Sequence, residues 1–137
     1  MSESMKYQWL VEGKVMLLIM QGEVQMEDLV EYDREMTAIL DGMTDPIFFV
    51  SDLSRLNKFP SIGDSLKLKS LRHPKLGTAV VIGAFKNGIL KFFMRVITST
   101  FRVGYKDAAT LEEAQQHILS IDPTLPAPET WNMVVRA

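Results

Sequence analysis

PIFFVSDLSRL, residues Pro46–Leu56, is the stretch that decides the fold, because an apolar run passes directly into polar residues. The run Ile47–Val50 is short and made of bulky or β-branched residues, which predicts a strand buried on both faces of a parallel sheet. Asp52, Ser54 and Arg55 follow where that strand leaves the core. In open α/β sheets, ligands bind at this end of the strands. An aspartate there also suits a plain turn, in which its carboxylate accepts hydrogen bonds from nearby backbone N–H groups.

Length and composition predict one folded domain. The chain has 137 residues, of which 47% are hydrophobic, so a sizeable core can form. Cysteine is absent, which excludes disulfides and thiolate chemistry and fits a cytoplasmic protein. The first residues lack a signal-peptide pattern, and the apolar stretch Val15–Met20 is too short to span a membrane. We expect a soluble, single domain over residues 1–137, with its core at about 7–121 and a proline-containing tail at 122–137.

Charge is distributed unevenly along the chain, although the net charge is only −2. Residues 23–45 hold eight acidic residues and one basic residue, whereas residues 55–106 hold eleven basic residues and one acidic residue. Such runs are commonly no more than solvated faces. The alternative is a bipolar molecule whose basic half meets an anionic partner.

Hydrophobic periodicity predicts alternating strands and helices. Gly13 suits a tight hairpin turn because glycine adopts positive φ, and Thr110 with Glu113 forms a capping box at a helix start. Strands are expected at Tyr7–Glu12, Lys14–Gly22, Pro46–Val50, Leu76–Ala84 and Phe101–Tyr105, and helices at Met26–Asp41, Ile62–His73, Ile89–Thr100 and Thr110–Ser120. This order predicts an α/β fold with a five-stranded, mixed but mostly parallel sheet, an N-terminal hairpin and four helices.

Two segments carry more detailed expectations. In Met26–Asp41, the acids should lie largely on the solvent-exposed face, opposite a buried stripe. After the strand Pro46–Val50, residues Ser51–Pro60 should form a loop. The buried stripe is expected to consist of Met26, Leu29, Val30, Met36, Thr37 and Leu40.

In the order of its elements, and in the segments FFVSDLSRL, LGTAVVIGA and FRVGYKDAATLEEAQQHIL, the chain resembles the STAS domains. The resemblance covers roughly Trp9–Ile121 and is in particular to the SpoIIAA-like branch, which relates anti-sigma-factor antagonists to CRAL-TRIO lipid-binding domains. It implies a SpoIIAA-like β-α superhelix and a non-enzymatic binding or regulatory role. We expect this module to bind either an anionic or lipid-like ligand or a protein partner.

Signalling members of the family carry Asp-Leu-Ser after the third strand and, later, Asp-Ser-Ser-Gly, whose second Ser is phosphorylated by a partner kinase. Asp52-Leu53-Ser54 matches the first motif. At the second, Ser61 and Gly63 match, but Ile62 stands where the phosphorylated Ser would be. An isoleucine cannot accept phosphate, so we expect no phospho-switch at that position. An anti-sigma-factor antagonist type of phospho-switch is kept as the alternative function.

Residue patterns for catalysis and metal binding are not found in the sequence. His73 and His117 are expected to be isolated, exposed histidines. Gly83–Gly88 has the glycine spacing of a phosphate-binding P-loop, but Ile89 and Leu90 follow where Lys and Ser or Thr are required. The protein is therefore expected to be no enzyme, with no cofactor and no metal.

Bases and aromatics alternate in Lys91-Phe92-Phe93-Met94-Arg95. This pattern suits single-stranded nucleic acid or a membrane surface, but it also suits an ordinary amphipathic helix with Phe93 inward and the bases outward. We adopt the amphipathic helix and expect no nucleic-acid partner.

A binding surface is expected where the basic segment meets the strand ends. Sheet ends and helix starts both favour ligands there, and Arg55, Lys58 and Lys86 supply positive charge. Simple solvation of these charges is the alternative. The apolar tail at Trp131–Val135 should pack back on the domain or on a second chain, and together with the uneven charge it further predicts a homodimer. The predicted ligand-binding residues are Asp52, Ser54, Arg55, Lys58, Ser61 and Lys86.

Overall fold

A five-stranded sheet in the order β1-β2-β3-β4-β5 organises the chain. The computed structural model describes residues 4–83, 88, 91, 92, 95, 96, 99 and 104–132, and for Ile62 only the backbone. β1 and β2 are antiparallel, and every later neighbour along the sheet is parallel, as the sequence predicts. The strands are β1 (Met5–Val11), β2 (Val15–Glu23), β3 (Ile47–Lys58), β4 (Leu76–Ile82) and β5 (Tyr105–Ala108).

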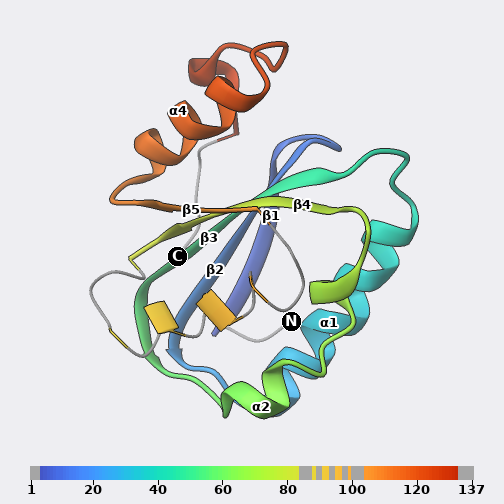
Figure 1. Cartoon of the computed structure of the whole chain (residues 1–137), viewed down its shortest axis with the longest axis vertical. Coiled ribbons are helices and arrows are strands. Elements are labelled where there is room, and N and C mark those ends of the chain that lie inside the picture. The colour runs from blue at the N-terminus through green and yellow to red at the C-terminus, as the bar shows by residue number, and fades with distance from the viewer. Residues whose placement is uncertain are drawn as a thin grey trace.

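Helices cover both faces of the sheet, with α1 and α2 on one face and α4 on the other (Figure 1). In the part of the chain that the structure describes, three α-helices are complete, where the sequence predicted four. The predicted helix Ile89–Thr100 lies mostly outside the described residues. The helical elements are α1 (Met26–Asp41), α2 (Ile62–Ser65), α4 (Leu111–Ile121) and the 3-10 turns η1 (Ser70–Arg72) and η3 (Pro128–Thr130).

Alternation along the inner strands divides the core into two layers. Phe49 of β3 faces α1 and packs in a cluster with Met36 and Leu40, whereas Val50 faces α4 and packs in a cluster with Ile118. The side chains of Phe49 and Val50 point to opposite faces and are at most 3% exposed, which confirms that the apolar run Ile47–Val50 is a strand buried on both faces. β4 is likewise an inner strand, between β3 and β5.

The β1–β2 turn confirms the role expected of Gly13. This residue has φ 71°, and the turn closes with a bond from the Lys14 N–H to the Val11 carbonyl, 2.9 Å. At the start of α4 half of the expected capping box is present, since the Thr110 hydroxyl accepts from the Glu113 N–H at 3.1 Å. The Glu113 carboxylate accepts from the N–H of Ala109 at 3.1 Å, one residue before the N–H that a capping box would use.

The acids of α1 correct an expectation, because most of them do not point freely into solvent. Asp33 accepts bonds from the backbone N–H groups of Lys69 and Ser70, at 2.9 and 2.7 Å, and so caps η1. Glu35 accepts a bond of 2.7 Å from the Tyr7 hydroxyl. Val30, expected in the core, is 56% exposed. The acidic segment is thus used largely to fasten α1 to its neighbours.

Ile62–His73 is not the continuous helix that its apolar spacing predicted. α2 is a single turn, and η1 follows as a separate 3-10 turn. The carboxylate of Asp33 satisfies the N–H groups at the start of η1 and thereby fixes a second helix start within the segment. Because the capping residue Asp33 lies 37 residues before Ser70, the hydrophobic periodicity of the segment Ile62–His73 carries no sign of this helix start.

Two further boundaries differ from expectation. β5 is Tyr105–Ala108, so the strand continues three residues beyond the predicted end at Tyr105, in parallel register with Ala79–Ile82 of β4. Residues 101–103 of the predicted strand Phe101–Tyr105 lie outside the described residues. The expected loop Ser51–Pro60 is mostly strand, since β3 extends to Lys58. Polar residues dominate that part of β3, so it lacks the apolar alternation of a typical strand.

Residues 122–132 return along the sheet and complete the α4 side of the core. Trp131 is 4% exposed and packs in the cluster that contains Leu10 of β1. The Asn132 N–H donates to the Leu10 carbonyl at 3.0 Å. Trp131 therefore packs back on its own domain, one of the two outcomes its apolar character allowed. Met133–Val135 lie outside the described residues.

Candidate functional site at the end of β3

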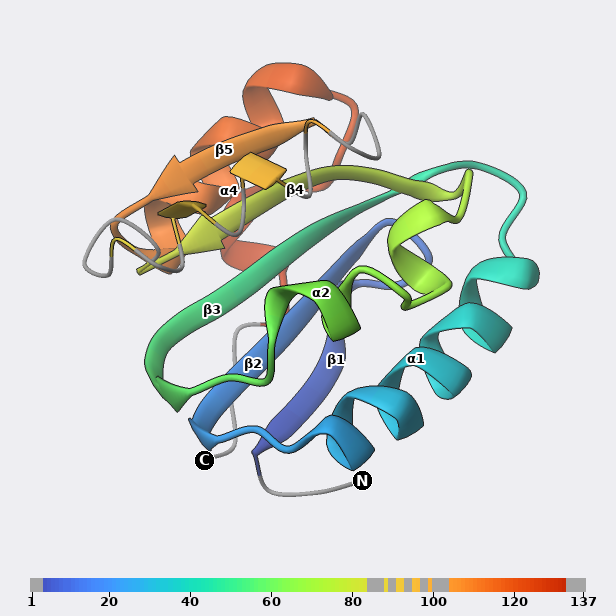
Figure 2. The same ribbon diagram turned by 60° about the horizontal axis from the view of Figure 1, so that its bottom comes forward.

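The carboxyl end of β3 continues beyond its neighbour β4. Pairing with β4 ends at Asp52 opposite Ile82, whereas pairing with β2 continues to Lys58 opposite Glu23. Figure 2 shows β3 curving away from β4 toward α2. The register with β2 shifts twice in this part, each time with one extra residue in β3. Such bulges bend a strand and redirect its side chains, and they are common beside functional sites.

Asp52 stabilises the first of these irregularities. Its Oδ1 atom accepts from the Ser54 N–H at 3.0 Å and from the Ser54 hydroxyl at 2.6 Å. The carboxylate thus satisfies a backbone N–H at the point where the regular register is broken. Asp52 and Ser54 are therefore brought together, with Asp52 holding the local backbone.

Gly83, the residue directly after β4, packs against the same part of β3. It has φ 87°, and a Cβ on it would lie 2.8 Å from Cα and 2.9 Å from N of Ser54. Only glycine fits that contact and that conformation. Gly83 belongs to the site architecture, although our choice of site residues from sequence omitted it. The one available signal was a glycine directly after the apolar run Leu76–Ile82.

Arg55 and Lys58 are exposed on the continuation of β3. Their register partners on β2 are Gln21 and Glu23. Beneath the strand, the buried side chains of Leu53 and Val81 form a small apolar cluster. This part of β3 is consequently anchored by its apolar side chains while its basic side chains reach solvent.

Ser61 acts as the cap of α2. Its hydroxyl accepts from the Asp64 N–H at 3.2 Å and donates to an Asp64 carboxylate oxygen at 2.8 Å. Lys67 lies 3.7 Å from the other carboxylate oxygen of Asp64. Ser61 is therefore engaged with Asp64, and not with Asp52 or Ser54.

Lys86 lies outside the described residues, so its position relative to β3 stays a prediction. Phe92, from the alternating basic and aromatic stretch, is 59% exposed. The inward orientation expected for Phe93 falls outside the described residues.

Both histidines have carboxylate neighbours, which corrects the expectation that they are isolated. The His73 ring is only 12% exposed, with Nε2 2.7 Å from Oδ1 of Asp41. Its Nδ1 accepts from the Lys75 N–H at 3.1 Å. His117 lies 3.6 Å from Glu113. Both contacts fasten structural elements, and over the residues described no group of three His, Cys, Asp or Glu side chains could hold a metal ion.

Tyr105 on β5 borders the apolar cluster beneath β3. Its hydroxyl donates to the carboxylate of Asp107. Burial is the larger cause, and this hydrogen bond the next, of a pKa of the Tyr105 hydroxyl that lies well above its ordinary value. The phenol is held neutral at physiological pH and acts as a hydrogen-bond donor.

These features define an α/β protein with a mixed sheet, a hairpin at its start and a polar, bulged strand end. No protein-family model matches the chain, and comparison of its sequence with curated proteins gives no match. Among the described helices, none is long and apolar enough to cross a membrane.

Solved structures do resemble it. One is an uncharacterized DUF3478-family protein with a SpoIIAA-like fold from Shewanella loihica PV-4, at 17% identity and TM-score 0.64, covering 85% of this chain and 98% of the other. Another is the Bacillus cell fate determinant SpoIIAA in its phosphorylated form, at 17% identity and TM-score 0.59, covering 83% and 98%. A third is the anti-sigma factor antagonist SpoIIAA in its unphosphorylated form, at 18% identity and TM-score 0.61, covering 89% and 99%. The chain has a SpoIIAA-like fold.

Proposed function

We propose that the protein is a single-domain, non-enzymatic binding or regulatory module of the STAS type that acts in the cytoplasm. Its binding surface, which we call the β3-end surface, consists of Ser54, Arg55, Lys58, Ser61 and Lys86, with Asp52 as a positioning residue. The observation that carries this proposal is the bulged continuation of β3, which presents exposed Arg55 and Lys58 beyond the end of β4. The SpoIIAA-like fold supports it by analogy.

An anionic group is the ligand chemistry that suits this surface. Arg55 can grip a phosphate or carboxylate in bidentate fashion, and Lys58 adds a second positive charge three residues later. Such a group can belong to a lipid headgroup or to an acidic protein partner. Asp52 is occupied with Ser54, so it orders the strand and does not bind the anion itself.

Vesicle binding tests the surface directly. The natural protein should sediment with vesicles that contain phosphatidylglycerol and should not sediment with purely zwitterionic ones. A triple variant, Arg55→Ala with Lys58→Ala and Lys86→Ala, should lose most of that binding. Added salt should also weaken it, because exposed charges are screened beyond ~10 Å at 0.1 M. Soluble poly-glutamate, used as competitor, separates general recognition of carboxylates from recognition of the headgroup.

The matched control removes three basic residues from other surfaces, Lys6→Ala with Arg34→Ala and Lys106→Ala. It changes net charge equally but should bind like the natural protein. Equal losses in both triple variants would mean that only total charge matters, and the β3-end surface would be misplaced. If the natural protein binds neither vesicles nor poly-glutamate, an anionic ligand is wrong.

The alternative function is a phospho-switch of the anti-sigma-factor antagonist type. Ser61 is the hydroxyl nearest in sequence to the family position, and it is already bonded to Asp64 at the start of α2. A phosphate there would face the carboxylate of Asp64, which opposes the added charge. We expect no phosphate on Ser61 in protein from its native host. Stoichiometric Ser61 phosphate by mass spectrometry would establish the alternative instead.

We also propose that the protein forms a homodimer, although the residues expected to mediate it are bound within the chain. Trp131 packs in its own chain, and Asp33 and Glu35 are bonded within it. What supports association is the exposed stripe of α1 that contains Val30 and Glu27. Sedimentation equilibrium at micromolar concentration should give a dimer that Val30→Glu dissociates. A monomer of the natural protein would contradict it, and native mass spectrometry of fresh protein would also reveal any co-purified ligand.

A further inference from the structure

A cavity of about 470 Å³ lies at the opposite end of the sheet from the β3-end surface. Three segments line it: the β1–β2 turn, the loop from α1 into the start of β3, and the first residue after α4. The turn and the start of β3 are joined by a bond from the Phe48 N–H to the Lys14 carbonyl, 2.9 Å. Because β2 and β3 are parallel, this is the amino end of both strands. The volume is within the usual range for small-molecule pockets, ~300–1,000 Å³.

Part of the lining is apolar. Met43, Pro46 and Phe48 contribute to it, and both Met43 and Phe48 are partly buried against the core layers. Met43 comes from the loop after α1 and Phe48 from the start of β3. A flat or flexible hydrocarbon group can rest on such a thioether and ring.

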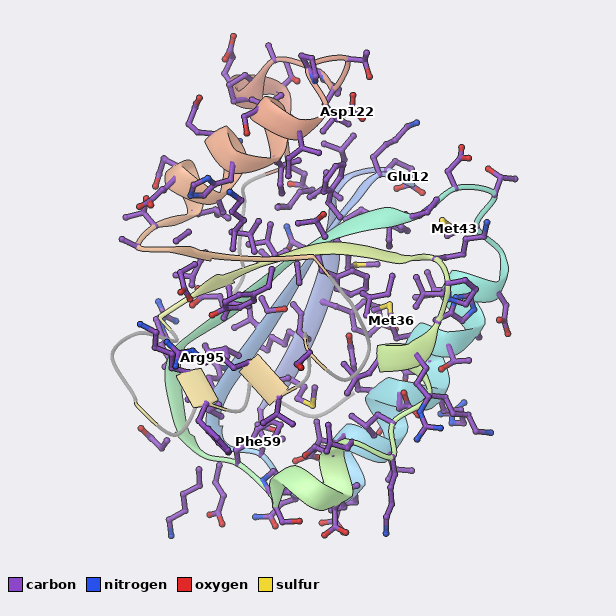
Figure 3. The ribbon with its side chains drawn as sticks, viewed as in Figure 1. Glu12, Met36, Met43, Phe59, Arg95 and Asp122 are labelled. Atoms are coloured by element: carbon purple, nitrogen blue, oxygen red, sulfur yellow. The ribbon has the colours of Figure 1, made fainter. Side chains whose placement is uncertain are left out.

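Carboxylates from all three segments also line the cavity. They are Glu12 in the turn, Asp45 in the loop and Asp122 at the end of α4, with one base, Lys14, among them. In Figure 3, Glu12 lies between Asp122 above and Met43 to the right. Bonds from Thr124, and to a lesser extent the charge of Lys14, hold the pKa of Asp122 below its ordinary value, so this carboxylate stays ionised.

Glu12 and Asp45 differ from Asp122 in their partners. Within the described residues, neither of their carboxylates forms a hydrogen bond or ion pair, and both residues are exposed at the rim. Their charge is thus available to a ligand, whereas many of the acids on α1 already bind groups of the chain.

The end of α1 adds negative potential to the same place. Gly42 and Met43, its first residues beyond the helix, line the cavity, and α1 has no basic residue in its last turn. The carbonyl end of a helix attracts cations. Lys75 offsets part of this potential by donating to the Thr44 carbonyl at 2.8 Å, but it is not among the lining residues.

We propose that this cavity binds a small organic cation, an ammonium ion carried on an apolar group. The apolar part rests on Met43, Pro46 and Phe48, and the ammonium group lies between Glu12 and Asp45. This site is separate from the β3-end surface and is selective for the opposite charge. It lies away from the carboxyl ends of the strands, where open α/β folds usually bind ligands.

Phenethylammonium is a suitable probe, and phenethyl alcohol is its neutral counterpart. Titration of the full chain, followed by amide NMR, should shift the signals of Gly13 and Gly42 in a saturable manner. The alcohol should bind at least about fivefold more weakly, because two exposed ion pairs each contribute modestly. Salt should reduce that difference. Equal affinity of the two probes, or no shift at millimolar probe, would overturn the proposal.

Paired variants locate the site. Glu12→Gln with Asp45→Asn should weaken phenethylammonium about five- to tenfold and leave the alcohol unchanged. The control pair, Glu23→Gln with Glu129→Gln, removes two exposed carboxylates that do not line the cavity and should change neither affinity. Loss of binding in the control pair would mean that the probe responds only to net charge. Unchanged binding in the cavity pair would mean that Glu12 and Asp45 do not hold the ammonium group, and either result would overturn the proposal. The vesicle results do not affect this outcome, since the two sites carry opposite charge.

Discussion

Gly83 packs so closely on Ser54 that no side chain fits between β4 and β3 at that point. Gly83→Ala should destabilise the protein by about 1–3 kcal/mol, from positive φ and from collision with the Ser54 backbone. Gly63→Ala is the matched control, because a Cβ there meets nothing within 4 Å. Urea unfolding of both variants measures the difference, and equal stability of the two would contradict the proposed contact.

Asp52 should contribute to stability and not only to binding. Asp52→Ala removes the acceptor of the Ser54 N–H and hydroxyl, and we expect a loss of about 1–2 kcal/mol. Asp52→Asn keeps an oxygen acceptor and should lose less. Chemical denaturation gives both values. If the two variants lost the same free energy, or Asp52→Ala lost none, the carboxylate would not be ordering the strand.

The central position of β3 in the core makes Phe49 a sensitive residue. Phe49→Ala should cost about 3–5 kcal/mol, because Phe49 is 3% exposed and packs with the α1 layer. Phe92→Ala deletes the same group where the ring is 59% exposed, and should change stability by less than ~0.5 kcal/mol. A loss below ~1 kcal/mol for Phe49→Ala on denaturant titration would show that the assigned core is wrong.

All three tyrosines should resist ionisation in the folded protein. Burial and the bond to Glu35 raise the pKa of Tyr7 to about 12, and burial raises the pKa of Tyr32 and Tyr105 as well. The folded state therefore keeps protons that the unfolded chain releases near its ordinary pKa of 10. Their contribution to stability is complete below pH 10 and is lost as the pH rises through the folded pKa.

Tyrosinate absorbance during an alkaline titration checks this expectation. Ionisation should be delayed beyond pH 10 and should coincide with unfolding. The variant Tyr7→Phe should show a shallower loss of stability with pH. A tyrosine that titrates at its ordinary pKa while circular dichroism stays native would contradict the prediction.

A helix or strand could be predicted from the sequence where the residues that stabilise it lie within the same segment, and could not where they lie far along the chain. The inner strands follow from local apolar runs such as Ile47–Val50, and α1 follows from its own periodicity. The break between α2 and η1 depends on Asp33 of a different helix. The polar part of β3 is strand because β2 pairs with it, which its own residues do not encode.

The candidate site was predictable in part for the same reason. Asp52, Ser54, Arg55 and Lys58 follow an apolar strand, so their place at a sheet end can be expected from sequence. The pairing of Ser61 with Asp64 has the same local three-residue spacing as Thr110 with Glu113, so the sequence carried a signal for it. The packing of Gly83 on Ser54 needs the three-dimensional arrangement. The amino-end cavity combines Glu12, Asp45 and Asp122 from distant parts of the chain, and no local motif marks it.

The packing of Trp131 near Leu10 has a consequence for biosynthesis. β1 is synthesised before α4, and part of the apolar layer that covers β1 is supplied by a residue made more than a hundred codons later. A nascent chain therefore exposes that layer of its sheet until residue 131 has left the ribosome. During this interval the uncovered strands are a surface for chaperones, and a stall shortly before that codon would leave the chain prone to aggregation.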